Sequence, residues 1–156
     1  MTLKATLIAG LAAASVIASA GLGLAQEEKK NPVVEARQSL MHLYAFNLGL
    51  LGGMAKGEIE YDAEAAGAAA SNLAALAATD QTRIWAEGTD NATLGDSTEA
   101  LPAIWENSDD FAAKRTALVE ASATMADAAG GGLEGLRGAM GALGGACGGC
   151  HKAYRK

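Results

Sequence analysis

The stretch Cys147-Gly148-Gly149-Cys150-His151 constrains this chain more than any other feature of its sequence. It reads C-x-x-C-H, the spacing at which two thiols bond to the vinyl groups of one haem and the adjacent imidazole binds the iron. The sequence therefore predicts one covalently attached haem c, held by Cys147 and Cys150, with His151 as an axial iron ligand. The fold has to cover this large flat group.

The two cysteines of this motif are the only ones in the chain. In an exported protein they could instead form a disulfide, but such a bridge would close a very small loop, and the histidine directly after it favours haem. Five residues follow His151 in this sequence. We therefore expect any second axial ligand to come from far upstream.

The first 25 residues have the composition of a targeting segment. Lys4 precedes an apolar run that ends near Ile17, and small residues follow, which is typical of a secretory signal peptide. Cleavage is predicted either after Ala20 or after Ala25, and the charged stretch that begins at Gln26 favours the second site. The run is also long enough for a marginal membrane anchor, but its small residues favour cleavage.

The prediction is thus a cleaved signal peptide over residues 1–25, a single domain over 26–156, export to the periplasm and no stable membrane insertion. Covalent haem attachment in bacteria takes place in the periplasm, so the two predictions agree. The net charge is −6 and the isoelectric point is near 4.8. An acidic chain is unsuited to nucleic acid, which needs a basic face, but it permits basic redox partners.

Four segments of the chain show the three- and four-residue apolar spacing of bundle helices. They run from about Pro32 to Ala55, Asp62 to Ala78, Asp109 to Ala129 and Leu133 to Tyr154. Asn31 and Asp62 suit helix N-caps, as do Ser108 or Asp109, and Gly57 suits a helix end. No strand pattern is evident. We predict an all-α protein, an antiparallel four-helix bundle with covalently bound haem c.

Two further features modify that picture. The connection over residues 79–107 is rich in turn formers, but Trp85, Leu101, Ile104 and Trp105 indicate that parts of it pack against the bundle. The last helix carries a glycine at every third residue from Gly132 to Gly144, and each interior glycine costs about 1 kcal/mol relative to alanine. A close contact between helices is the favoured explanation, and we expect the helix to need packing and haem to hold it.

The first helix offers candidates for the haem's surroundings. Arg37 lies on the apolar seam, so it needs either a structural carboxylate from a neighbouring helix or a haem propionate. Met41 lies one turn further on the same face, where a methionine is either a wall of packed atoms or a sulfur ligand. His42 lies off the seam, and we expect it to be exposed or flanking.

The chain resembles the cytochrome c prime family, the class II c-type cytochromes. Three stretches carry the resemblance: residues 36–41 in the first helix, Pro102-Ala103-Ile104-Trp105 in the connection, and Cys147 to Lys156 at the end. The resemblance covers the chain after the signal peptide. It implies a four-helix bundle, commonly a homodimer, with high-spin five-coordinate haem.

The resemblance also implies roles for single residues. The family's arginine near the propionates falls on Arg37, its neighbouring haem contact on Gln38 and its bulky distal residue on Met41. The basic residue close to the proximal imidazole falls on Arg155. Further haem-edge contacts fall around Glu99 and Leu101. Low-spin relatives use a methionine at the position of Met41 as sixth ligand, and some high-spin members carry one there without ligation.

Two functions therefore stay open. The favoured one is a periplasmic haem protein with a vacant iron site that binds small gases such as NO and CO, with or without electron transfer. The alternative is a low-spin Met/His electron-transfer cytochrome of the same class. No nucleophile–base pair or carboxylate pair indicates an enzyme. A homodimer is expected because Leu40, Leu43 and Ala65–Ala69 exceed what one core needs.

Overall fold

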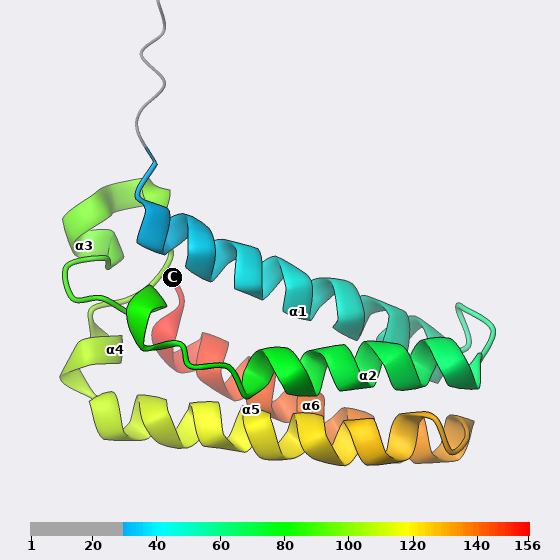
Figure 1. Ribbon diagram of the computed structural model, residues 1–156. Coiled ribbons are helices and arrows are strands. Elements are labelled where there is room, and N and C mark those ends of the chain that lie inside the picture. The colour runs from blue at the N-terminus through cyan, green and yellow to red at the C-terminus, as the bar shows by residue number, and fades with distance from the viewer. Residues whose placement is uncertain (1–29) are drawn as a thin grey trace, which may run out of the picture.

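The structure is a computed structural model that describes residues 30–156, and the predicted signal peptide and its cleavage site lie outside this range. Four long helices form an antiparallel bundle (Figure 1). They are α1 (Pro32–Lys56), α2 (Ala63–Ala77), α5 (Ser108–Ala129) and α6 (Leu133–Tyr154). The predicted all-α four-helix architecture is confirmed.

The ends of the helices follow from their capping residues. The Asn31 side chain accepts hydrogen bonds from the amides of Val33 (3.0 Å) and Val34 (3.4 Å), and Gly57 ends α1 in the left-handed region at φ 78°. Asp62 caps α2 by accepting from the Ala65 amide at 2.7 Å. The expected cap of α5 is wrong, because Ser108 is already the first residue of the helix and the side chain of Asn107 makes no capping bond.

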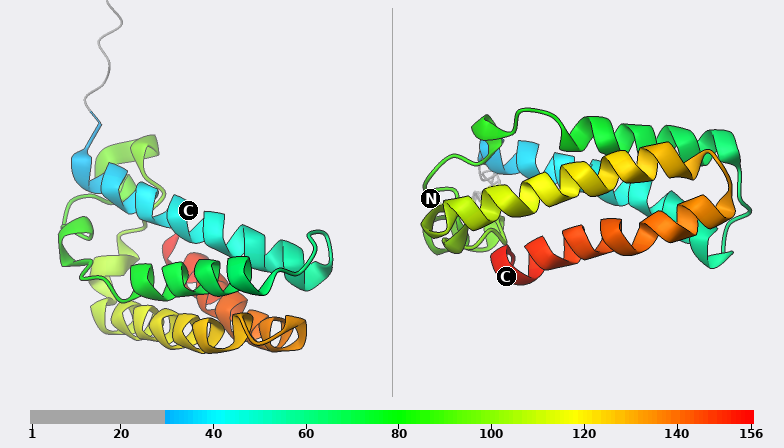
Figure 2. Two further views of the ribbon diagram at one scale, coloured as in Figure 1. Left: turned by 45° about the vertical axis from the view of Figure 1, so that its right-hand side comes forward. Right: turned by 90° about the horizontal axis from the view of Figure 1, so that it is seen from below.

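The connection between α2 and α5 is folded rather than open. It contains four short helical elements: η1 (Thr82–Ile84), α3 (Asn91–Leu94), η2 (Gly95–Ser97) and α4 (Ala103–Glu106). These elements gather at the end of the bundle where α1 begins and α6 ends (Figures 1 and 2). The connection therefore covers the end that carries the C-x-x-C-H motif.

The core has two parts. The larger one fills the bundle, where Leu51, Leu73, Met125, Leu136 and Leu143 are fully buried. The smaller one joins the connection to the end of α6, and its buried members are Ala100, Ile104, Phe111 and Tyr154. No helix in the described part of the chain is long and apolar enough to cross a membrane.

One of two expectations about small residues is wrong, the close helix contact at the glycines of α6. On α2, Ala66 and Ala69 are buried in the protein's own core, whereas Ala65 is half-buried and Ala68 is exposed. Along α6, a methyl group added at Gly138, Gly141 or Gly144 would meet no atom within 4 Å. At Gly135, by contrast, an added methyl would lie 2.8 Å from the Ala128 carbonyl oxygen. Most of the α6 glycines therefore face open space and do not serve close helix packing.

Candidate haem-binding site

The C-x-x-C-H motif lies in the last two turns of α6. Cys147 and Cys150 are half-buried free thiols, one turn apart on the helix, and His151 is exposed. Burial raises the pKa of both thiols. Atoms added at Gly148 and Gly149 would meet nothing within 4 Å. The motif thus presents two half-buried thiols and an exposed imidazole from one short segment.

Aromatic rings hold the end of α6 in place. The Tyr154 ring meets the Phe111 ring edge-on at 5.3 Å, and Phe111 meets Trp85 edge-on at 4.8 Å. The Tyr154 hydroxyl donates to the Asp110 carboxylate, which raises the pKa of Tyr154 to about 12. Cys150 packs against this smaller core. The thiol position is therefore tied to both α5 and the connection.

Arg37 is the most unusual side chain near this end of the bundle. It is 4% exposed, and its guanidinium donates only to neutral oxygens. Nη1 donates to Thr89 Oγ1 (3.0 Å) and the Ile84 carbonyl (3.4 Å), while Nη2 donates to the Thr89 carbonyl (2.8 Å) and Thr98 Oγ1 (2.8 Å). The guanidinium also lies over the Trp85 ring at 4.9 Å.

A structural carboxylate, one of the two explanations offered for Arg37, is not found. Within residues 30–156 no ion pair involves Arg37. Burial lowers its pKa, but a guanidinium keeps its charge in proteins. A buried cation without a counter-charge is costly, so this site suits an added anion. The thiols, the imidazole and this cation together fit a haem with its propionates.

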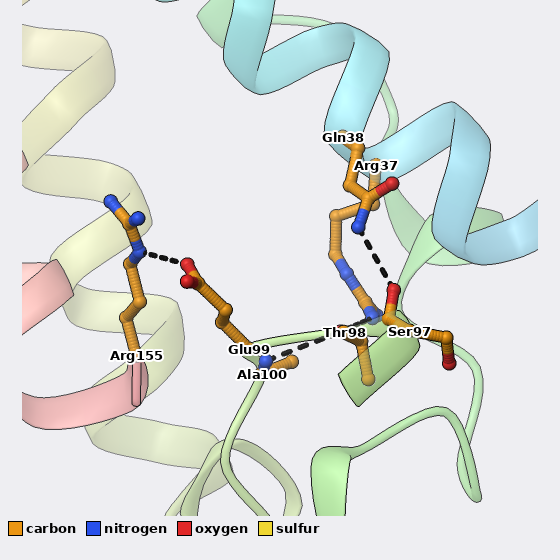
Figure 3. Close-up of polar contacts among 7 residues, drawn as sticks. All are labelled: Arg37, Gln38, Ser97, Thr98, Glu99, Ala100 and Arg155. Atoms are coloured by element: carbon orange, nitrogen blue, oxygen red, sulfur yellow. Dashed lines mark hydrogen bonds and ion pairs between the residues drawn. The ribbon is translucent and has the colours of Figure 1, made fainter. Parts of the chain in front are cut away.

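The neighbours of Arg37 on α1 take different positions. Gln38 is exposed and donates from Nε2 to the Ser97 carbonyl at 3.0 Å (Figure 3). Met41 is half-buried and packs against the larger core, one turn beyond Arg37. His42 is exposed, as expected. Met41 thus contacts the apolar interior of the bundle.

The segment that contains Glu99 and Leu101 pairs with the tail of the chain. The Leu101 amide donates to the Tyr154 carbonyl (3.0 Å), and the Lys156 amide donates to the Glu99 carbonyl (2.9 Å). The Arg155 guanidinium forms an ion pair with the Glu99 carboxylate (Figure 3), which lowers the pKa of Glu99. Glu99 and Arg155, expected as separate contacts, are thus brought together.

The ion pair of Arg155 and Glu99 also affects the pKa of His151. Burial is the main cause that lowers the pKa of His151, the positive charge of Arg155 lowers it further, and Glu99 opposes this effect. A lowered pKa keeps the imidazole neutral near pH 7, and a neutral imidazole is the form that binds iron. Arg155 is thus close enough to His151 for its charge to affect the pKa of the imidazole.

Several residues of this end could not be found from the sequence. Thr89, Thr98 and Ser97 accept hydrogen bonds from Arg37 or Gln38 but lie 52 to 61 residues further along the chain. The sequence indicated them only indirectly, because an arginine on an apolar seam needs hydrogen-bond acceptors from another part of the chain. Asp110, the partner of Tyr154, carried no signal either, because acidic residues are common in the first turn of a helix.

Comparison with known proteins agrees with this geometry. The sequence profile of the Cytochrome C' family matches residues 32–155. Cytochrome c-554 of Cereibacter sphaeroides is 52% identical over 134 residues, which cover 85% of this chain and 87% of that protein. Cytochrome c' of the same organism is 43% identical, covering 83% of this chain and 80% of that protein.

Solved structures extend the likeness to three dimensions. A cytochrome c' from a Rhodobacter superposes with a TM-score of 0.77 and 44% identity over 80% of this chain and 95% of that chain. A cytochrome c' from Thermochromatium tepidum superposes with a TM-score of 0.72 and 30% identity over 80% of this chain and 94% of that chain. The likeness spans all four long helices.

Proposed function

Because the chain belongs to the cytochrome c' family, whose members carry one covalently attached haem c, we propose that Cys147 and Cys150 attach that haem and that His151 binds its iron. The observation that carries the proposal is the end of α6, where one short segment presents two free, half-buried thiols and an exposed imidazole. Replacing Cys147 and Cys150 with serine should abolish covalent haem, measured as haem that stays with the denatured chain.

We propose that Arg37 lies near the haem propionates and that Gln38 is a neighbouring haem contact, with Glu99 and Leu101 at the haem edge and Arg155 beside the proximal imidazole. No carboxylate within residues 30–156 forms an ion pair with the buried Arg37, which supports this assignment, and so does the pairing of residues 99–101 with the chain after His151. Replacing Arg37 with glutamine, which keeps hydrogen bonding but removes the charge, should lower the haem reduction potential. A positive charge near the haem disfavours the more positive ferric state.

The favoured function is the binding of small gases. The haem supplies an iron atom able to bind a diatomic molecule, and this chain supplies His151 on one side and the apolar side chain of Met41 as the wall on the other. Two similar structures, variants of cytochrome c' from Alcaligenes xylosoxidans, are described with carbon monoxide and with nitric oxide bound. Reduced protein should change its visible spectrum when CO is added, and an unchanged spectrum at high CO would contradict this function.

The alternative is an electron-transfer cytochrome with Met41 and His151 both on the iron. The high identity to a relative named cytochrome c-554 rather than cytochrome c' keeps this function open. The ferric spectrum of the unmodified protein separates the two. A low-spin spectrum that becomes high-spin in Met41→Ala would establish the alternative, and a high-spin spectrum before any substitution would exclude it. Neither function requires the chain to be an enzyme.

A homodimer through α1 is also proposed. Leu43 is 48% exposed and Phe46 is 78% exposed, and they lie three residues apart on the outer side of the helix. Replacing Phe46 with glutamate should convert a dimer to a monomer in light scattering, while the spectrum stays unchanged. A monomer at high concentration of the unmodified protein would rule out this interface.

The proposed location is the periplasm, reached by cleavage after Ala25. The apolar segment at the start of the sequence and the need to attach haem outside the cytoplasm support it. Mass spectrometry of the purified protein should find Gln26 as the first residue. A chain that still begins at Met1 would contradict cleavage.

A further inference from the structure

Thr98 lies between the two sides of the proposed haem site. It is 3% exposed, and its Oγ1 accepts hydrogen bonds from Arg37 Nη2 at 2.8 Å and from the Ala100 amide at 3.2 Å. Figure 3 shows Thr98 between Arg37 of α1 and the segment that leads to Glu99 and Ala100. One oxygen thus holds both the buried guanidinium and the backbone of the connection.

The backbone segment after Thr98 pairs with the tail of the chain. Ala100 and Arg155 form an isolated antiparallel bridge, and hydrogen bonds on either side join Leu101 to Tyr154 and Lys156 to Glu99. The Lys156 ammonium also lies 3.2 Å from the Asp96 carboxylate. Residues 98–101 therefore form a short strap between α1 and the residues that follow His151.

Hydrogen bonds also define which N–H groups of Arg37 are already used within the protein. A guanidinium has five N–H groups, and the four on Nη1 and Nη2 have acceptors in the connection. In the described part of the chain only the Nε–H has no acceptor. The terminal fork that would suit a two-point carboxylate contact is already used, so the Nε–H is the donor of Arg37 that would remain for an added carboxylate.

We propose that Thr98 is a positioning residue, which fixes the Arg37 side chain for the haem and ties that side of the site to the tail beyond His151. Its hydroxyl sets the orientation of the guanidinium and, through the Ala100 amide, the register of the strap against Arg155. This proposal rests on the haem site proposed above. The coupling between α1 and the tail, however, can be measured without reference to the haem.

The test compares Thr98→Val, which replaces the hydroxyl by a methyl of similar size, with Thr98→Ser, which keeps the hydroxyl. Thr124→Val is the matched control, because Thr124 also uses its hydroxyl, on the Glu120 carbonyl at 3.0 Å, but lies in α5 on an exposed face. If Thr98→Val does not fold, Thr98→Ala removes the hydroxyl without adding an apolar group. All variants are studied as haem-loaded protein.

Two measurements decide the matter. In Thr98→Val, hydrogen exchange of the Leu101 and Lys156 amides should accelerate by about tenfold, the size expected for a lost bond to a charged group, and the reduction potential should fall. Thr98→Ser and Thr124→Val should match the unmodified protein in both. Unchanged exchange at Leu101 and Lys156 in Thr98→Val, or a Thr98→Ser variant as impaired as Thr98→Val, would overturn the proposal.

Failure of the haem assignment gives a different result. A chain that carries no covalent haem would remove the basis for the potential measurement, yet the exchange of Leu101 and Lys156 would still report whether Thr98 ties α1 to the tail. If Thr98→Val accelerates the exchange of these two amides but leaves the reduction potential unchanged, the role of Thr98 lies in the fold alone. That result would also overturn the proposal.

Discussion

The two halves of α6 are held in different ways. In the first half, Leu136 is fully buried, Gly135 lies against the Ala128 carbonyl, and Arg137 Nε donates to the Ala55 carbonyl at 2.8 Å. In the second half, from Gly141 to His151, only Leu143 is buried and the cysteines are half-exposed. Protein atoms hold the first half, while the second half presents its groups to open space.

The difference between the two halves indicates how the proposed haem would support this helix. The second half contains five glycines, namely Gly141, Gly144, Gly145, Gly148 and Gly149, whose summed cost relative to alanine is roughly 4 to 5 kcal/mol. That is comparable to the whole stability of a small domain. Besides the buried Leu143, this half therefore depends on the anchor at Tyr154 and on the haem proposed at Cys147 and Cys150.

The largest expected effect comes from removing the haem. In the Cys147→Ser, Cys150→Ser double variant, backbone amides between Gly144 and His151 should lose protection from hydrogen exchange and approach the rates of an unfolded chain. Amides around Leu136 should keep theirs, because their support is protein packing. Equal loss in both halves would show that α6 is one cooperative unit and that the contrast between its halves is wrong.

The next effect tests the first half. Gly135→Ala places a methyl 2.8 Å from the Ala128 carbonyl oxygen, so the backbone has to move, and we expect a destabilisation of about 1 to 3 kcal/mol. Urea unfolding of the haem-loaded protein measures it. Gly138→Ala is the control, since the same change there meets no atom within 4 Å. Similar losses in the two variants would contradict a packing origin.

Gly141→Ala should act in the opposite direction in the second half. The added methyl meets nothing within 4 Å, and alanine restricts the unfolded chain more than glycine does, so stability should rise by roughly 0.5 to 1 kcal/mol. The same urea titration measures the change. A loss of stability at Gly141 would mean that another molecule covers this face in solution.

The sequence predicted some parts of this contrast and missed others. Asn31, Gly57 and Asp62 set helix ends through bonds to residues next to them, so local patterns were enough. The open face of the α6 glycines was missed, because glycine spacing looks the same whether a neighbour is present or absent. The Arg37–Thr98 contact spans 61 residues, and no local pattern encodes the folding of the connection that brings the two together.

The smallest effect concerns the Tyr154 anchor and appears with pH. Its bond to Asp110 raises the pKa of Tyr154 from 10.0 to about 12, so the folded protein holds the phenol proton more tightly than the unfolded chain does. The stabilisation is complete below pH 10 and is lost as the pH rises through about 12. Asp110→Asn replaces the charged acceptor of this hydrogen bond, which is the largest cause of the shift, by a neutral one and also removes the charge of Asp110. In ultraviolet difference spectra, the tyrosinate signal of Tyr154 should then appear at lower pH, and the unfolding midpoint should become less sensitive to alkali.

Tyr154→Phe identifies which tyrosinate signal belongs to Tyr154. The signal whose pH differs between Asp110→Asn and the unmodified protein has to be absent from the Tyr154→Phe spectrum. An alkaline titration that is the same in Asp110→Asn and the unmodified protein would show that the anchor is the buried ring against Phe111 and not the hydroxyl, and the second half of α6 would then depend on packing at its last turn as well.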